Sequence, residues 1–147
     1  MEKPQNLLTS RRFLPMFLTQ FFGALNDNVY KQSLLLVITY GLIQHNSGNV
    51  STLNNLAALL FIAPYFVFSA TAGQIADKFE RSQLVRGIKI LELIIMSIGS
   101  LGFMLGQIWL LLFALFLMGV HSTFFGPIKY AIIPQHMGEN ELVMANA

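Results

Sequence analysis

The chain has 147 residues, of which 54% are hydrophobic and only 11% are charged, whereas a soluble domain usually carries about 25% charged residues. So few charges cannot cover a water-exposed surface, and this excludes a soluble enzyme. The net charge is +2, but the basic residues flank apolar segments, so membrane topology explains them better than nucleic-acid binding does. There is no cysteine, which excludes disulfides and thiolate metal sites.

Two long stretches without Asp, Glu, Lys or Arg indicate helices that span a membrane. The first runs from Gln32 to Ala76 and the second from Leu93 to Ile128. A spanning helix needs about 20 apolar residues. The second stretch has 36 residues and would be roughly 54 Å long as one helix. Because this is too long for a single crossing, we expect the chain to turn at Gly106-Gln107.

The order of apolar segments predicts an all-α integral membrane protein. A cytoplasmic tail is expected over 1–12, and 13–147 is expected to form one truncated transmembrane domain. Pro127 and Pro134 should bracket a frayed end of the last span, and a fifth helix should begin at about 142. The four predicted spans, in chain order, are 13–43, 53–76, 84–105 and 108–126.

The distribution of basic residues predicts which side of the membrane each loop faces. The loops at 44–52 and 106–107 contain no Lys or Arg, and short loops rich in these residues mark the cytoplasmic side. The N-terminus and the end of the fourth span are therefore expected to be cytoplasmic. Eight of the nine basic residues agree with this orientation, namely Lys3, Arg11, Arg12, Lys78, Arg81, Arg86, Lys89 and Lys129.

The first span carries polar and small residues along one side. Asp27 is expected near the middle of the bilayer, where a charge costs at least about 2.5–3.5 kcal/mol, and Lys31 follows it by one helical turn. The stripe predicts either a substrate or ion path facing a cavity, or a buried ion pair that sets helix packing. Asn26 and Asn28 flank it and suit the same path or hydrogen bonds to neighbouring helices. The stripe, within about 60° of one line, comprises Gln20, Gly23, Ala24, Asp27, Tyr30 and Lys31.

Two more ionisable residues lie inside the later spans. Glu92 is expected about 12 Å into the third span, with Lys89 placed to pair with it, and its role is either structural or in the substrate path. His121 is either a proton relay or, as we favour, a packing histidine. No pattern forms a catalytic triad, a metal cluster or a phosphate-binding loop, so we expect no enzyme activity in this chain and no cofactor or metal.

The loop after the second span resembles a known transporter signature. Four residues, Gly73, Asp77, Lys78 and Arg81, match the motif between helices two and three of the major facilitator superfamily. Glu80 replaces the usual glycine of that motif. The resemblance implies a conformational latch, in which the Asp77 carboxylate meets the positive end of a partner helix dipole and Arg81 holds it.

Two further segments resemble the bacterial lysophospholipid transporters of that superfamily. They are Phe21–Asn28 in the first span and Phe125–Tyr130, followed by Pro134, at the end of the fourth. The resemblance implies inward movement of lysophospholipid, chiefly lysophosphatidylethanolamine, across the bacterial inner membrane. Some members of that family are fused to acyltransferase and acyl-carrier-protein ligase domains.

A major facilitator half has six helices and the whole transporter has twelve, so we interpret this chain as an N-terminal fragment. Its expected partners are the lysophospholipid substrate, membrane lipids and a missing C-terminal transporter half. Three alternatives stay open: a major facilitator transporter of another substrate, a small four-helix transporter that works as a dimer through Asp27 or Glu92, and a membrane anchor for a fused acyltransferase.

Overall fold

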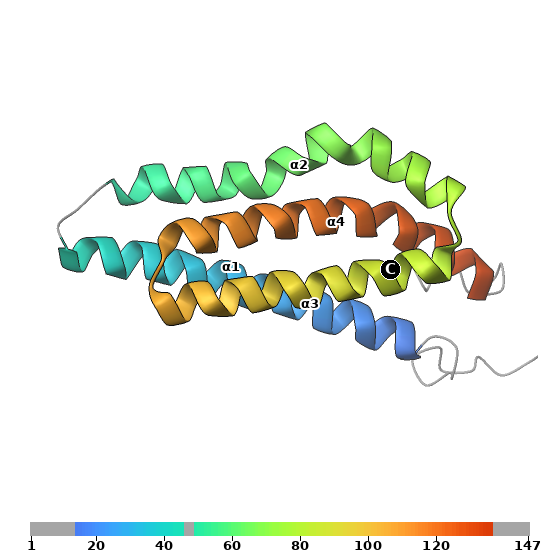
Figure 1. Cartoon of the computed structure of the whole chain (residues 1–147), viewed down its shortest axis with the longest axis horizontal. Coiled ribbons are helices and arrows are strands. Elements are labelled where there is room, and N and C mark those ends of the chain that lie inside the picture. The colour runs from blue at the N-terminus through green and yellow to red at the C-terminus, as the bar shows by residue number, and fades with distance from the viewer. Residues whose placement is uncertain (1–13, 46–48, 137–147) are drawn as a thin grey trace, which may run out of the picture.

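The computed structural model of the chain describes residues 14–45 and 49–136. It contains four α-helices and confirms the all-α prediction. Consecutive helices run in opposite directions, so that the chain goes back and forth along one long axis (Figure 1). The predicted tail over 1–12 and the helix expected at about 142 lie outside the described residues. The helices are α1 (Leu14–His45), α2 (Val50–Lys78), α3 (Arg81–Leu105) and α4 (Ile108–His136).

Local capping groups fix where α2 begins and where the chain turns into α3. The Asn49 side chain accepts hydrogen bonds from the backbone N–H of Ser51 at 3.2 Å and from its hydroxyl at 2.6 Å. This satisfies one of the donors that every helix N-terminus leaves free. At the other end Phe79 and Glu80 are extended, so two residues suffice to connect α2 to α3.

The predicted turn at Gly106-Gln107 is present. Gly106 adopts a left-handed conformation with φ of 63°, which a glycine reaches without steric cost. Its backbone N–H donates to the Phe103 carbonyl at 3.3 Å, and the N–H of Gln107 donates to the Gly102 carbonyl at 3.1 Å. These bonds satisfy the last carbonyls of α3 and direct the chain back along α3 as α4.

The packing of the bundle centres on α4, which lies between α2 and α3 and makes most of the interhelical contacts (Figure 1). The first half of its inward face is apolar and buried, from Leu111 to Met118, whereas α1 packs more loosely. One directional contact fixes α1: the Tyr30 hydroxyl donates to the Leu111 carbonyl at 2.8 Å, and its ring lies against Gly99. The buried core comprises Tyr30, Leu34, Ile38, Ile95, Leu111, Leu112, Ala114, Leu115 and Met118.

The fourth helix continues beyond the expected frayed end and stays helical through Pro127 and Pro134 to His136. A proline removes one backbone hydrogen bond and bends a helix, but a membrane offers no water to the backbone groups that an unwound segment would free. A second internal proline, Pro64, lies within α2, whose ribbon changes direction about halfway along its length (Figure 1).

Three helical segments are long and apolar enough to cross a membrane, namely Val50–Lys78, Ser82–Leu105 and Ile108–Tyr130. This agrees with a membrane protein. Among the described residues, no segment of the 32-residue α1 reaches the same length and apolarity, and its middle carries Asn26, Asp27, Asn28, Lys31 and Gln32. That α1 also crosses the membrane therefore stays a prediction.

The approach of α4 to α2 at Gly119 gives a test of the packing. A Cβ atom at this position would come within 3.0 Å of the Phe61 carbonyl oxygen of α2. We expect Gly119→Ala to destabilise the protein by about 1–3 kcal/mol through overpacking, measured as a lower thermal unfolding midpoint in detergent. At Gly41 of α1, no atom lies within 4 Å of the corresponding Cβ, so Gly41→Ala is the matched control. Equal midpoints for the two variants would contradict this contact.

Candidate functional site

A polar cavity of about 200 Å³ lies between α1, α3 and α4. Four residues of the predicted stripe line it from α1: Gln20, Gly23, Ala24 and Asp27. The helical period places these residues on one side of α1, and the bundle turns that side toward α3 and α4. The remaining lining residues are Lys89, Glu92, His121, Ser122, Phe125, Gly126 and Lys129.

The Asp27 carboxylate faces α4 across this cavity. It accepts one long hydrogen bond, from the Ser122 hydroxyl to Oδ2 at 3.4 Å. Within the described part of the chain, no ion pair joins Asp27 to Lys31. Such a weakly satisfied carboxylate inside an apolar bundle keeps most of its capacity to bind a cationic or donor group.

The Glu92 carboxylate lies between two basic side chains. Its Oε2 atom is 2.6 Å from the Lys89 ammonium nitrogen, as the spacing of the two residues predicts, and 3.7 Å from the Nε2 atom of His121. His121 is buried, and its Nε2 makes no hydrogen bond in the described structure. The lysine ammonium also lies 5.1 Å from the centre of the Phe125 ring. A carboxylate, an ammonium group and an imidazole therefore meet at one wall of the cavity.

Gly23 allows this cluster to lie against α1. A Cβ atom at Gly23 would come 3.2 Å from the Lys89 nitrogen and 3.6 Å from Glu92 Oε1. The small residue in the stripe thus lets the ion pair of α3 approach the α1 backbone, one turn from Asp27. The polar groups of all three helices are brought together by this close approach.

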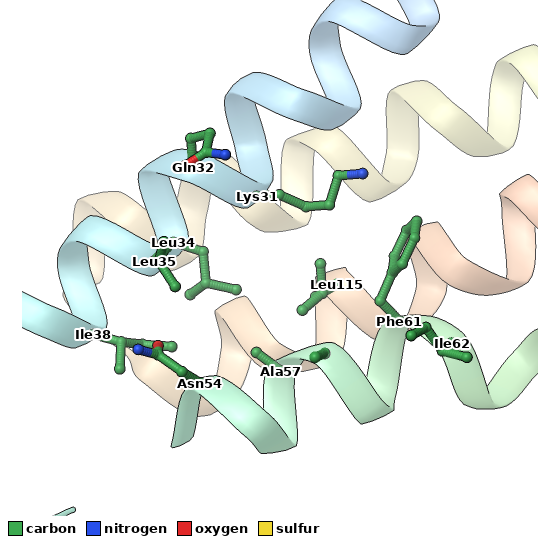
Figure 2. Close-up of a pocket in the computed structure, with 11 residues that line it drawn as sticks. Lys31, Gln32, Leu34, Leu35, Ile38, Asn54, Ala57, Phe61, Ile62 and Leu115 are labelled. Atoms are coloured by element: carbon green, nitrogen blue, oxygen red, sulfur yellow. The ribbon is translucent and has the colours of Figure 1, made fainter. Parts of the chain in front are cut away.

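Lys31 lies away from Asp27, although the two residues are one turn apart on α1. Its ammonium nitrogen is 4.5 Å from the centre of the Phe61 ring of α2, and it lines a second cavity of about 290 Å³ (Figure 2). The interpretation as a buried Asp27–Lys31 ion pair is therefore wrong. A four-residue spacing permits a contact, but the long lysine side chain points toward α2 while Asp27 faces α4.

The two asparagines differ in their surroundings. Asn28 is exposed, and its amide nitrogen donates to the Ala24 carbonyl of its own helix at 2.8 Å, so it makes no bridge to a neighbouring helix here. Asn26 is half-buried. Neither residue lines the polar cavity.

The residues of the predicted latch lie at the turn between α2 and α3. Asp77 and Lys78 are exposed, and no atom lies within 4 Å of a Cβ built on Gly73. Arg81 begins α3, and its side chain is outside the described ones. Within the described residues no hydrogen bond or ion pair reaches Asp77, so Asp77 and Lys78 present an accessible surface at this end of the bundle.

Sequence reasoning missed Lys129 as a cavity residue. The sequence places Lys129 in a cytoplasmic segment, because Pro127 predicts the end of the span. Once α4 continues through Pro127, Ser122 and Lys129 are seven residues apart and share a helical face. The cavity then carries two lysines against two carboxylates, Asp27 and Glu92. Among the described residues, no group of acidic, histidine or cysteine side chains could hold a metal ion.

Thiol labelling tests whether water fills this cavity. Because the 147 residues contain no cysteine, a single cysteine can be introduced into a cysteine-free full-length background. We expect Ser122→Cys to react rapidly with a small, water-soluble thiol reagent, because only a hydrated thiol ionises readily. Ser100→Cys, on the exposed face of α3 and outside both cavities, should react far more slowly. A rate for Ser122→Cys as slow as that of Ser100→Cys would show that the cavity is dry.

Comparison with known proteins points to one class of transporter. The chain is 27% identical over 142 residues to proteins called "Lysophospholipid transporter LplT" from Yersinia pestis (strain Pestoides F) and Yersinia pseudotuberculosis serotype O:3 (strain YPIII). The match covers 95% of this chain and 31% of each relative, so the chain spans about a third of the relatives' length. No protein-family profile matches, and no solved structure matches. The chain is thus a distant relative of lysophospholipid transporters.

Proposed function

We propose that this chain is the N-terminal part of a secondary transporter that moves lysophospholipid inward across the bacterial inner membrane. The observation that carries the proposal is the polar cavity, which holds opposite charges from three helices inside an otherwise apolar bundle. Ionisable groups in that environment are costly and mark substrate or ion paths. The name of the distant relatives supports a lysophospholipid as the substrate.

The charges of the cavity suit a zwitterionic headgroup such as that of lysophosphatidylethanolamine. Asp27 and Glu92 attract its ammonium group, and Lys89 and Lys129 favour the negative charge that lies close to it. These interactions become stronger when the bound headgroup displaces water from the cavity, because less solvent then screens the charges. The substrate path therefore consists of Gln20, Asp27 and Glu92 from the predicted set, with Lys129 added on α4.

The rest of a longer protein would complete this path. In a major facilitator arrangement a second half faces the first across the substrate cavity, and Gly73, Asp77, Lys78 and Arg81 would form the latch against it. An exposed carboxylate beside the end of a partner helix is stabilised by that helix's dipole. The latch would then favour the state closed to the cytoplasm.

Uptake of lysophosphatidylethanolamine into vesicles that contain the full-length protein tests the proposal. Asp27→Asn keeps the shape of the side chain and removes its charge, so we expect uptake to fall by roughly tenfold or more. Thr19→Val is the matched isosteric control, because Thr19 is exposed on the same helix and its hydroxyl bonds only the Pro15 carbonyl. Absence of uptake by the unmodified protein, or equal uptake by Asp27→Asn, would contradict the proposal.

Membrane orientation is tested by side-specific labelling of single cysteines. With the N-terminus in the cytoplasm, the start of α2 faces the periplasm and the start of α3 faces the cytoplasm. A membrane-impermeant thiol reagent should label Ser51→Cys in intact cells whose outer membrane has been made permeable. It should label Ser82→Cys only after the inner membrane is opened. Both residues are exposed, and the reverse pattern would invert the proposed topology.

A further inference from the structure

The second cavity, of about 290 Å³, lies between α1, α2 and α4, and it is farther along α1 toward the C-terminal end of that helix than the polar cavity. Lys31 and Phe61 lie at one end of it, and Ile38 and Asn54 lie at the other (Figure 2). The other lining residues are aliphatic except for the amide Gln32. The aliphatic residues are Leu34, Leu35, Ala57, Ala58, Ile62 and Leu115.

Among the described residues that line this cavity, Lys31 alone carries a charge. Its nitrogen lies over the face of the Phe61 ring, which stabilises a cation weakly, and no carboxylate pairs with it among the described residues. An ammonium group inside a membrane bundle needs an anion or water to offset its desolvation. The cavity therefore combines an unpaired cation at one end with apolar walls along its length.

We propose that this cavity binds the single acyl chain of a lysophospholipid, with the phosphate of the lipid against Lys31. This inference rests on the proposed function and assigns a site to the acyl chain, which the polar cavity does not suit. The cavity is at the lower limit of small-molecule pockets, which span about 300–1,000 Å³, so it takes one chain rather than two. The chain would run from Lys31 toward Ile38 and end before Asn54, whose Oδ1 is buried without a hydrogen bond in the described structure.

The position of Lys31 on α1 connects the two cavities. Lys31 follows Asp27 by four residues, which is roughly 6 Å along the helix, so a phosphate at Lys31 lies within reach of the polar cavity. In the proposed topology the chain then points toward the periplasm and the headgroup toward the cytoplasm. A lipid in the cytoplasmic leaflet has this same orientation. The headgroup would therefore reach the cytoplasmic side before the acyl chain does.

Photolabelling locates the acyl chain directly. Lysophosphatidylethanolamine that carries a diazirine on its chain is bound to the full-length protein in vesicles, activated by light, and the labelled residues are identified by mass spectrometry. We expect labels on Ala57, Phe61 or Leu34, lost when unlabelled lysophosphatidylethanolamine competes. Phe66 is 83% exposed on the same helix and reports contact with bulk lipid. Labels on Phe66 but none on the cavity walls would overturn the proposal.

Chain-length preference gives an independent test. Ala57→Leu fills part of the cavity, so we expect binding of long-chain lysophosphatidylethanolamine to fall by about tenfold while short-chain binding changes little. Ala70→Leu, at an exposed position of α2 outside the cavity, is the matched control. Lys31→Gln should weaken binding of all chain lengths alike, and Lys31→Arg should restore it. An equal loss for long and short chains with Ala57→Leu would contradict an acyl-chain site.

The outcomes separate this inference from the proposed function. If uptake occurs and depends on Asp27 but the cavity walls stay unlabelled, the transporter proposal stands and the acyl-chain site is wrong. If the walls are labelled and competition removes the label but no uptake occurs, the site stands and the transport proposal is wrong. Because labelling uses the unmodified protein, this result does not depend on any variant folding.

Discussion

The constraint on which this structure depends is the cost of placing charged groups inside an apolar bundle. Asp27, Lys89 and Glu92 lie in helices that are mainly apolar, and each must find a partner or water. The bundle meets this requirement by turning the charged sides of α1, α3 and α4 toward one cavity. The Lys89–Glu92 pair is closely satisfied at 2.6 Å, whereas Asp27 keeps only one long hydrogen bond. Because its hydrogen bonding is less complete, Asp27 is more available to a ligand than the paired Lys89 and Glu92.

Close helix packing is what allows these charges to meet. At Gly119 the α4 backbone approaches the Phe61 carbonyl of α2 too closely for any side chain, and at Gly99 α3 accepts the ring of Tyr30 from α1. Inside a membrane, small residues of this kind let dispersion forces hold helices together. Gly23 has a different role, because the space that a side chain would occupy there holds the Lys89–Glu92 ion pair of α3. The same helix surfaces therefore determine both stability and the shape of the polar cavity.

The same face of the first helix contributes to two cavities of opposite character. Asp27 faces the charged groups of α3 and α4, and one turn farther along the helix Lys31 faces an aliphatic space beside α2. A lysophospholipid has the same division between a charged headgroup and a single apolar chain. The looser packing of α1 against its neighbours leaves room for both cavities. The two cavities therefore match the two parts of the lipid, the charged headgroup and the apolar chain.

The sequence by itself determined the helices, the turn at Gly106-Gln107, the polar side of α1 and the Lys89–Glu92 pair. These features depend on local composition, helical period and the conformational freedom of glycine, all of which act within a few residues. Only the tertiary structure decided that the Lys31 ammonium lies over the Phe61 ring and not beside Asp27. It also decided that α4 stays helical past Pro127 and that Lys129 lines the polar cavity. Such outcomes depend on which helix lies opposite each side chain and on whether neighbouring packing supports a helix through a proline. Interhelical contacts of this kind join residues far apart in the chain, and helical spacing within a single segment does not contain that information.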